Sequence, residues 1–448
     1  MRRLPLLVLL ASLPAAAQSV TITAPSLFVL PNEGRNPAGQ IEGIEGGAYT
    51  ARASDVGAVY YNPAGLGLSK KSSVSAASAA YEWTFYTGEV GEIADTGSRL
   101  SSNGRLFGFV VGSETLKSEK LSLGFAIPTP ASWKPTLQLN GALATASGEA
   151  DLLYSADGSY SDIVPTIAAG YALKPGLRVG ASLGVSFLTL TQTQESFAQA
   201  VAGSSAGATQ RTFRADGTSY DLILTGGLQW DLSPGLTLGL VVAAPGLRLG
   251  GSTGLFAVES TAVGGAFRSV AFRDAEAEFT VRHPAKVSLG LSWRFAHGEI
   301  EADVKYVAGA SAYELFASDV PGAWTSGSAS SGETGVATFT PAYDERRSVT
   351  NVAVGGRWDL TPKTSIHLGL FTAFSPVGES SVFTAVDVYG VSAGVSLNWA
   401  HLSGSLGFAY EWGNEADPFR GDEAQAPGPS GELGISSVHL LWGLTYKF

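Results

Sequence analysis

The chain has 448 residues, and only 15% of them are charged, against roughly 25% in an average soluble protein. Its formal net charge of −11 argues against nucleic acid as a partner, because binding to phosphates requires a cationic surface. A hydrophobic fraction of 45% excludes a disordered chain, and the absence of cysteine excludes disulfide scaffolds, thiolate metal sites and cysteine nucleophiles.

The first residues have the pattern of an export signal. Arg2 and Arg3 precede an apolar run over residues 4–13, and the small residues that end at Ala17 predict cleavage after it. An anchor helix is the alternative, but this run covers only about 15 Å of helix, half of a ~30 Å hydrocarbon core. With no cysteine after the small residues, a lipoprotein anchor is excluded. We therefore predict a signal peptide at 1–17 and a mature chain that leaves the cytoplasm.

Residues 18–71 differ from the rest of the chain because they show no strand alternation. They contain many small residues, among them Gly46, Gly47, Ala48 and Ala51. Such a segment is able to pack inside a barrel lumen or to hang from the barrel as a loose periplasmic tail. Composition alone does not choose between these two interpretations.

From residue 72 onwards the apolar residues recur with a period of two. Along the last strand the apolar face and the opposite, polar face separate clearly; the apolar residues are Val438, Leu440, Trp442, Leu444, Tyr446 and Phe448. No stretch approaches 18 uninterrupted apolar residues, so we expect no membrane-spanning helices. A soluble β-sandwich also alternates, but aromatic residues near the strand ends and a small, glycine-rich polar face favour a lipid-facing barrel.

Counting these segments predicts an all-β fold, a transmembrane antiparallel β-barrel of 14 strands over residues 72–448. The segments are 72–84, 104–113, 120–128, 162–174, 177–190, 218–231, 236–246, 276–295, 299–310, 346–360, 364–375, 387–400, 402–413 and 435–448. Pro284 interrupts one of them, and we interpret 276–295 as one strand kinked at the proline, because an even number keeps both ends periplasmic. Short and long connections then alternate, as expected for periplasmic turns and outer loops.

The segment before the first strand carries a recognisable motif. Gly47 and Ala51, then Asp55, then the run Asn62-Pro63-Ala64-Gly65 resemble the N-terminal hatch of the FadL/TodX family of outer-membrane transporters. The resemblance implies a 14-stranded barrel whose lumen is plugged by the N-terminal segment, so that 18–71 forms an extension and a hatch. The hatch motif residues are Asp55, Asn62, Pro63, Ala64 and Gly65. The lead before the motif, about residues 18–45, is longer than in the family.

The resemblance also implies a function and a set of partners. It implies passive uptake of long-chain fatty acids or aromatic hydrocarbons, outer-membrane lipids as surroundings, and recognition by the barrel-assembly machinery through the strand that ends in Phe448. The sequence does not choose between fatty acids and monoaromatic compounds. A relative that acts as a scaffold or shuttle for exported proteins remains the alternative.

Ligand capture is expected at the third and fourth long loops, which form the capture groove in the family. The candidate residues are Phe197, Val201, Phe213, Leu255, Phe256 and Phe267, and the alanine-rich part of the third loop is expected to be helical. An alternative is that these side chains only pack the loops together. For a lateral gate the resemblance implies a kink in the third strand, here with Gly124, Pro128 and Pro130, although an ordinary proline pair at a loop start explains them equally well.

Charged residues on the inward face are expected to pair, because unpaired burial is costly. Glu301, Asp303 and Lys305 fall on one side of a strand and are predicted to pair with one another or with the hatch. The five histidines form no HExxH-type metal pair, and no Gly-x-Ser-x-Gly elbow occurs. We therefore expect no enzyme activity, no catalytic residues, no metal and no cofactor.

Overall fold

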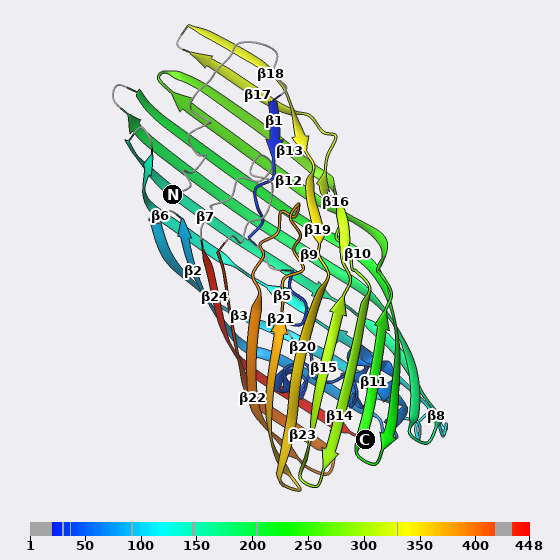
Figure 1. Cartoon of the computed structure of the whole chain (residues 1–448). Coiled ribbons are helices and arrows are strands. Elements are labelled where there is room, and N and C mark those ends of the chain that lie inside the picture. Colours follow the sequence, from blue (N-terminus) through cyan, green and yellow to red (C-terminus); the bar gives the residue numbers. More distant parts are fainter. Residues whose placement is uncertain are drawn as a thin grey trace.

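The computed structural model describes residues 20–28, 31–35, 37–90, 93–145, 148–202, 205–328, 330–416 and 432–448. The predicted signal peptide, residues 1–17, lies outside the described residues. Within the described ranges the molecule is a single closed β-barrel with an ordered crown at one end (Figure 1). Helix is confined to short turns near the N-terminus.

Fourteen strands of the described chain form the barrel wall, which confirms the predicted fold class. In order around the wall they are β2 (Ser73–Val90), β3 (Ile93–Val111), β4 (Leu121–Pro128), β8 (Thr166–Lys174), β9 (Leu177–Ala202), β10 (Ser205–Ser233), β11 (Leu236–Ala243), β14 (Lys286–Phe295), β15 (Gly298–Val307), β20 (Val349–Thr361), β21 (Thr364–Ala373), β22 (Val388–Asn398), β23 (Leu402–Glu415) and β24 (Leu433–Lys447). Each is antiparallel to the next, and β24 pairs with β2 to close the cylinder. Short turns and both ends of the wall, Ser73 and Lys447, lie at one end, which the barrel architecture assigns to the periplasm.

The interpretation of 276–295 as one kinked strand is wrong. Residues up to Phe279 belong to β13 (Ala266–Phe279), which pairs with neighbours in the crown, whereas the wall strand β14 begins only at Lys286. Pro284 lies in the irregular segment between them, because proline has no N–H group to donate to a ladder. The strand count is unchanged because this break separates a wall strand from a crown strand and adds no crossing.

The long connections form an ordered crown of hairpins. It contains β5 (Ala131–Trp133), β6 (Thr136–Thr145), β7 (Gly148–Ile163), β12 (Leu247–Val263), β13, β16 (Ala310–Ala317), β17 (Gly322–Ser328), β18 (Ser331–Thr340) and β19 (Ala342–Arg346). The expected helix in the third loop is wrong, because residues 191–202 continue β9, residues 205–217 continue β10, and the two strands pair with each other. Since β7 and β12 flank this hairpin on both sides, its backbone groups find ladder partners that a helix would give up.

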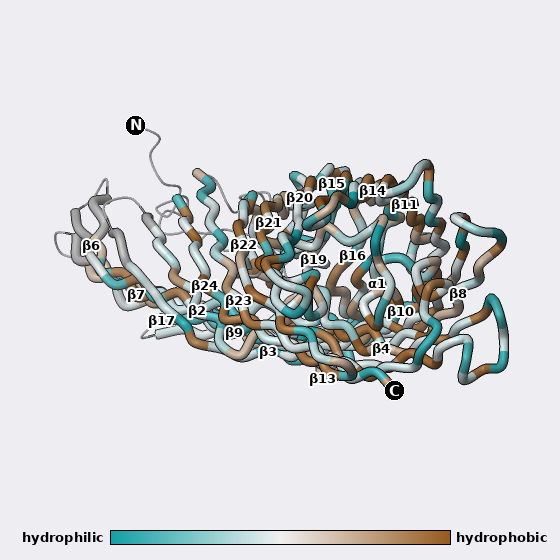
Figure 2. The backbone as a smooth tube through the Cα atoms, turned by 90° about the horizontal axis from the view of Figure 1, so that it is seen from below, coloured by the Kyte–Doolittle hydropathy of each residue, from teal (hydrophilic) through white to brown (hydrophobic). Residues whose placement is uncertain are grey.

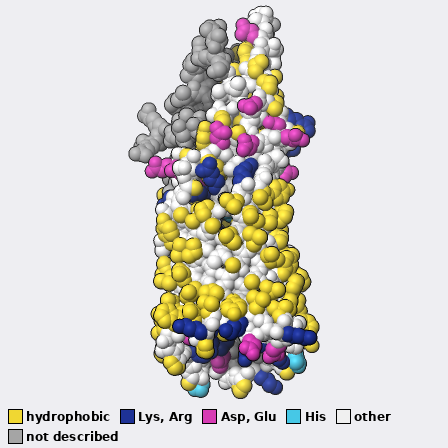
Figure 3. Space-filling view, turned by 90° about the vertical axis from the view of Figure 1, so that its right-hand side faces the viewer, with side chains coloured by type: hydrophobic (Ala, Val, Ile, Leu, Met, Phe, Trp, Pro, Cys, Tyr) yellow, Lys and Arg dark blue, Asp and Glu magenta, His cyan; other side chains and the backbone are white. Residues whose placement is uncertain are grey.

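Hydrophobic side chains cover the outside of the wall. Trp293, Leu368 and Leu406 are each more than half exposed, although they lie in the middle of regular strands. In Figure 3 hydrophobic side chains form a band between two charged rims, and Figure 2 shows hydrophobic residues recurring along the wall strands. An apolar band between polar rims is the surface of a barrel whose solvent is lipid. Among the described residues, no helix has the length and apolarity needed to cross a bilayer.

The described residues that precede β2, from Val20 onwards, lie inside the barrel and its crown. β1 (Val20–Thr23) pairs in parallel with β18 in the crown, and the chain then descends through the lumen to η2 (Gly43–Glu45), α1 (Ala58–Tyr61) and η3 (Pro63–Leu68) (Figure 1). We call residues 20–35 the strap and residues 37–68 the hatch. Most of their side chains are buried, so the lumen is filled by the chain itself from the crown to the periplasmic end.

Candidate functional site

Asn62 fixes the turn between the two helical pieces of the hatch. Its side-chain oxygen accepts from the backbone N–H of Ala64 at 3.1 Å, which caps η3, while Pro63 takes the first helical position. Its amide donates to the carbonyl oxygen of Thr50 at 2.7 Å and to that of Leu228 on β10 at 3.1 Å. The predicted motif residue therefore holds the hatch turn and ties it to the wall.

The other motif residues support the same turn. A β-carbon at Gly65 would lie 1.8 Å from the carbonyl oxygen of Ala53, so only glycine fits there. Ala64 is fully buried. Asp55 accepts from the backbone N–H of Gly57 at 2.9 Å, just before α1. Local hydrogen bonding and close packing thus account for the whole motif.

The wall leaves room for the hatch by presenting glycine. A β-carbon at Gly227 on β10 would lie 2.1 Å from Oδ1 of Asn62, and one at Gly180 on β9 would lie 2.3 Å from the carbonyl carbon of Pro63. Gly124 on β4 takes the same role, because a β-carbon there would lie 2.6 Å from a methyl group of Val59. Gly124 therefore makes space for the hatch.

A buried ionic network joins the lower hatch to the wall. Nε of Arg52 lies 3.0 Å from Oε2 of Glu301, and the same guanidinium pairs with Glu45. Glu45 in turn lies 2.5 Å from Nδ1 of His367, whose Nε2 lies 2.8 Å from the hydroxyl of Ser396. Burial opposes the charge of Glu45, but Arg52 and His367 together outweigh it, and the pKa of that carboxyl is lowered.

Asp303 and Lys305 complete this network. Asp303 accepts from the backbone N–H of Tyr49 at 3.0 Å and from the hydroxyl of Thr50 at 2.7 Å, and Lys305 donates to the carbonyl oxygen of Gly47 at 2.5 Å. The prediction that the inward charges pair with one another or with the hatch is confirmed. These contacts join the hatch to β15, whereas the three glycine contacts described above join it to β4, β9 and β10.

A second ionic cluster holds the lower end of the strap. Arg35 lies 2.9 Å from Glu411 and 3.3 Å from Glu82, and Arg105 lies 3.1 Å from Nδ1 of His439 beside them. All five side chains are at most 4% exposed. Sequence reasoning missed this cluster because its members come together only when β24 closes on β2.

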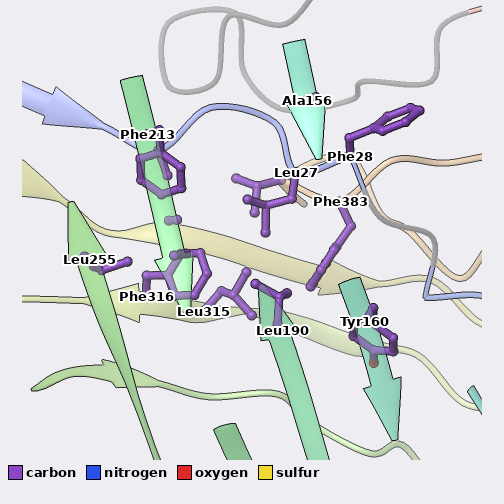
Figure 4. Close-up of a cluster of buried hydrophobic side chains, with 14 of the residues drawn as sticks. Leu27, Phe28, Ala156, Tyr160, Leu190, Phe213, Leu255, Leu315, Phe316 and Phe383 are labelled. Atoms are coloured by element: carbon purple, nitrogen blue, oxygen red, sulfur yellow. The ribbon is translucent and has the colours of Figure 1, made fainter. Parts of the chain in front are cut away.

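The upper part of the strap is held by hydrogen bonds of its backbone and by apolar packing of its side chains. Leu27 and Phe28 are buried in a cluster that fills the crown; its labelled members in Figure 4 are Ala156, Tyr160, Leu190, Phe213, Leu255, Leu315, Phe316 and Phe383. Thus two predicted capture residues, Phe213 and Leu255, face the strap. Phe256 and Phe267 are 37% and 45% exposed, and Phe197 is half-buried. The side chain of Val201 lies outside the described residues.

A cavity of about 170 Å³ lies between the strap and the hatch. Aromatic, aliphatic and small side chains make up much of its lining, including Val59, Tyr60, Tyr61, Val164, Ile223, Val241, Ala243, Val307, Ala353 and Phe371. At its polar end His283 lies 2.7 Å from Asp221 and 3.3 Å from Asp162, and Lys286 lies 2.5 Å from Glu33. In the sequence, the only signal for this end was the proline interruption next to His283.

The third strand borders this cavity through Pro130. Pro128 remains within the ladder, since it lies opposite Leu106 and its carbonyl oxygen accepts from the N–H of Val164 at 3.0 Å. Pro130 lies just beyond and lines the cavity. Below the hatch, two polar hollows of about 560 and 500 Å³ share Arg294 and Glu299 among their lining residues. The hatch therefore separates the mainly apolar cavity from polar space at the periplasmic end.

Known proteins match the chain in structure. No protein-family model matches the sequence, and neither does any curated protein. The toluene transporter TodX of P. putida aligns with a TM-score of 0.57 at 14% identity, over 92% of this chain and 99% of that one. The toluene transporter TbuX of Ralstonia pickettii gives 0.54 at 15% identity, over 92% and 99%. A Pseudomonas aeruginosa FadL homologue gives 0.54 at 11% identity, over 96% and 100%.

These likenesses establish the fold. The chain has the fold of the FadL/TodX proteins, which confirms at that level the resemblance first seen in the hatch motif. Together with its apolar band, this fold makes the chain a β-barrel of the outer membrane. Two of these solved structures are described as toluene transporters and the third as a FadL homologue.

Proposed function

We propose that the chain takes up small hydrophobic molecules passively across the outer membrane, with monoaromatic hydrocarbons as the preferred class. Molecules would be captured at apolar side chains of the crown such as Phe256 and Phe267, pass into the cavity, and leave through a gate formed by the hatch and the third strand at Pro130. Such a path keeps the apolar surface of the ligand out of water, which is favourable by about 25 cal/mol per Å².

The size of the cavity is the observation that carries this proposal. Its volume of about 170 Å³ is close to that of an engineered apolar cavity of about 150 Å³ that binds benzene. A single aromatic ring therefore fits, whereas a long-chain fatty acid has several times as many carbon atoms. Two of the proteins that share the fold are described as toluene transporters, which supports the same choice.

Filling the cavity tests the proposal. Ala243 on β11 faces the cavity, and its neighbour Val242 is 48% exposed on the outer face of the same strand. In Gram-negative host cells that lack other channels of this fold, we expect Ala243→Trp to lower the initial rate of radiolabelled toluene uptake at least fivefold. Val242→Trp is the matched control and should leave the rate within a factor of two.

The result also separates the alternatives. Uptake of radiolabelled oleate in preference to toluene would overturn the choice of ligand. Equal rates in cells with and without the wild-type chain would overturn transport altogether, and would favour a scaffold or shuttle for exported proteins.

A further inference from the structure

The ladder between β20 and β21 ends before the strands leave the wall. Paired residues run from Thr361 opposite Thr364 up to Ala353 opposite Phe371. Above Ala353, β20 continues to Val349 and stays paired with β15 on its other side. On the β21 side the chains meet again only where Arg346 bridges Val377. A strip of wall about four residues long therefore lacks backbone pairing in the described structure.

Two polar side chains bridge this strip. The hydroxyl of Thr372 accepts from the backbone N–H of Val352 at 3.0 Å and donates to Oδ1 of Asn351 at 3.2 Å. The same Asn351 oxygen accepts from the N–H of Phe374 at 2.8 Å. Rotation of these side chains breaks all three bonds, whereas opening a regular ladder requires the strands themselves to separate.

The cavity reaches this strip. Its lining includes Asn351, Val352 and Thr372, and also Tyr306 on the adjoining β15. Val352 and Tyr306 are 45% and 44% exposed on the bilayer side of the wall. The cavity thus extends from inward-facing residues such as Ala353 to residues whose side chains meet lipid.

The strip lies at the crown-side edge of the apolar band, because Tyr306 lies opposite Thr350 and Tyr389 lies opposite Thr372. Trp358 on β20 lies near the periplasmic rim. Six residues, or about 20 Å of strand, separate it from Val352 on the crown side. On the crown side, Phe374 packs edge-on against Tyr389, with ring centroids 5.6 Å apart. Backbone without ladder partners is tolerated at this depth only where it lines a cavity. The absence of pairing at this edge of the apolar band, where the strip also lines the cavity, therefore points to an opening.

We infer that the wall between β20 and β21, at Asn351, Val352 and Thr372, is a lateral portal between the cavity and the crown-side edge of the membrane's hydrocarbon core. This inference rests on the proposed function and adds a second side opening, across the lumen from the third strand. A monoaromatic hydrocarbon needs no water along such a path, and the bridging side chains close the strip when no ligand passes.

A disulfide across the strip tests the portal directly, because the chain contains no other cysteine. Val352→Cys combined with Thr372→Cys joins the two strands where the side chains now bridge them. A second lock, Phe125→Cys with Ile167→Cys, closes the third strand at two residues that lie opposite each other on β4 and β8. Val391→Cys with Tyr410→Cys, opposite residues in the continuous ladder of β22 and β23, is the matched control.

Initial rates of radiolabelled toluene uptake are compared before and after reduction, with heat-dependent gel mobility as the check on folding. We expect the β20–β21 lock to lower the rate at least fivefold when oxidised and to recover on reduction, with the control lock unchanged. An unchanged rate with the oxidised β20–β21 lock, while the third-strand lock abolishes uptake, overturns the portal and leaves the proposed function standing. If the wild-type chain gives no uptake, the proposed function fails first and the portal fails with it.

Discussion

The two halves of the lumen are filled by one continuous segment but held in different ways. In the crown half, Leu27 and Phe28 of the strap pack among aromatic and aliphatic side chains. In the periplasmic half, Arg52, Glu45 and Glu301 form buried ion pairs, and wall glycines such as Gly227 receive the hatch backbone. Apolar contact is non-directional, whereas buried ion pairs demand fixed geometry.

This difference suits the two ends to different tasks. An apolar ligand that displaces the side chain of Leu27 or Phe28 replaces one set of dispersion contacts with a similar one, so these side chains are able to rearrange at small cost while the backbone of Leu27 keeps its hydrogen bonds to Val382 and Thr384. Moving the hatch would separate Arg52 from Glu301 and Glu45 from His367 on the wall, which is costly in a buried site. We therefore expect ligand access to involve the strap and the wall before the hatch moves.

The largest effect should come from breaking the buried ion pairs in the periplasmic half of the lumen. Arg52→Met leaves Glu45 and Glu301 buried without their partner, which costs about 3–5 kcal/mol. We expect the hatch to loosen, so that single-channel conductance in planar bilayers rises and the unfolding temperature falls. Arg294→Met is the control, because Arg294 pairs with Glu299 while 66% exposed, and such pairs contribute about 0–1 kcal/mol. Equal behaviour of the two variants would show that the network does not hold the hatch.

Weakening the apolar packing of the strap in the crown half of the lumen should have the next largest effect. Leu27→Ala removes a fully buried side chain, at a cost of about 2–5 kcal/mol in the free energy of unfolding. Because the vacated space is apolar, toluene uptake should become faster while conductance to ions stays low. Leu153→Ala on the crown strand β7, 49% exposed, should change both far less. A slower uptake in Leu27→Ala would contradict a displaceable strap.

Features that depend on interactions between residues close in the chain could be predicted from the sequence, whereas features that depend on distant residues could not. Lipid imposes a period of two on every wall strand, so the fourteen crossings could be counted. The hatch turn was recognisable because it depends on a local contact. The side chain of Asn62 accepts a hydrogen bond from the N–H of Ala64, two residues further along the chain. The pairing of Arg35 with Glu411 was not, since 376 residues separate them and only barrel closure brings them together.

Other features were hidden by their composition. The crown hairpins resemble loops because threonine, serine, glutamine and alanine blur the alternation over 191–217, although both sides of that hairpin pair. The sequence around Asn351 and Thr372 has the pattern of an ordinary strand. The missing ladder there depends on where β21 turns away, which is a property of the assembled wall.

A smaller change, which adds one methyl group and no charge, tests how closely the hatch fits the wall. Gly227→Ala places a methyl group 2.1 Å from Oδ1 of Asn62, which must shift the hatch turn or the strand, at a cost of about 1–3 kcal/mol. Its neighbour Gly226 faces outward with no atom near its missing β-carbon, so Gly226→Ala is the matched control. Denaturant unfolding in micelles should separate the two variants. If both are equally stable, the fit of hatch to wall is looser than the contacts indicate.

The smallest effect is a gain in stability. It concerns Glu42, a buried carboxyl that forms no ion pair with the described residues. Burial, and then the charge of Asp55, raises the pKa of Glu42 well above its ordinary 4.5. Between that ordinary value and the raised one, the unfolded chain has released the proton while the folded chain still holds it, so stability falls as pH rises through this window. Glu42→Gln keeps the acceptor for the N–H of Ile41 and removes the titration. Its unfolding temperature should match wild type at pH 4 and exceed it at pH 8, whereas Glu333→Gln on exposed β18 leaves the pH profile unchanged. A wild-type pH profile in Glu42→Gln would mean that other groups, not this carboxyl, set the pH response of the hatch.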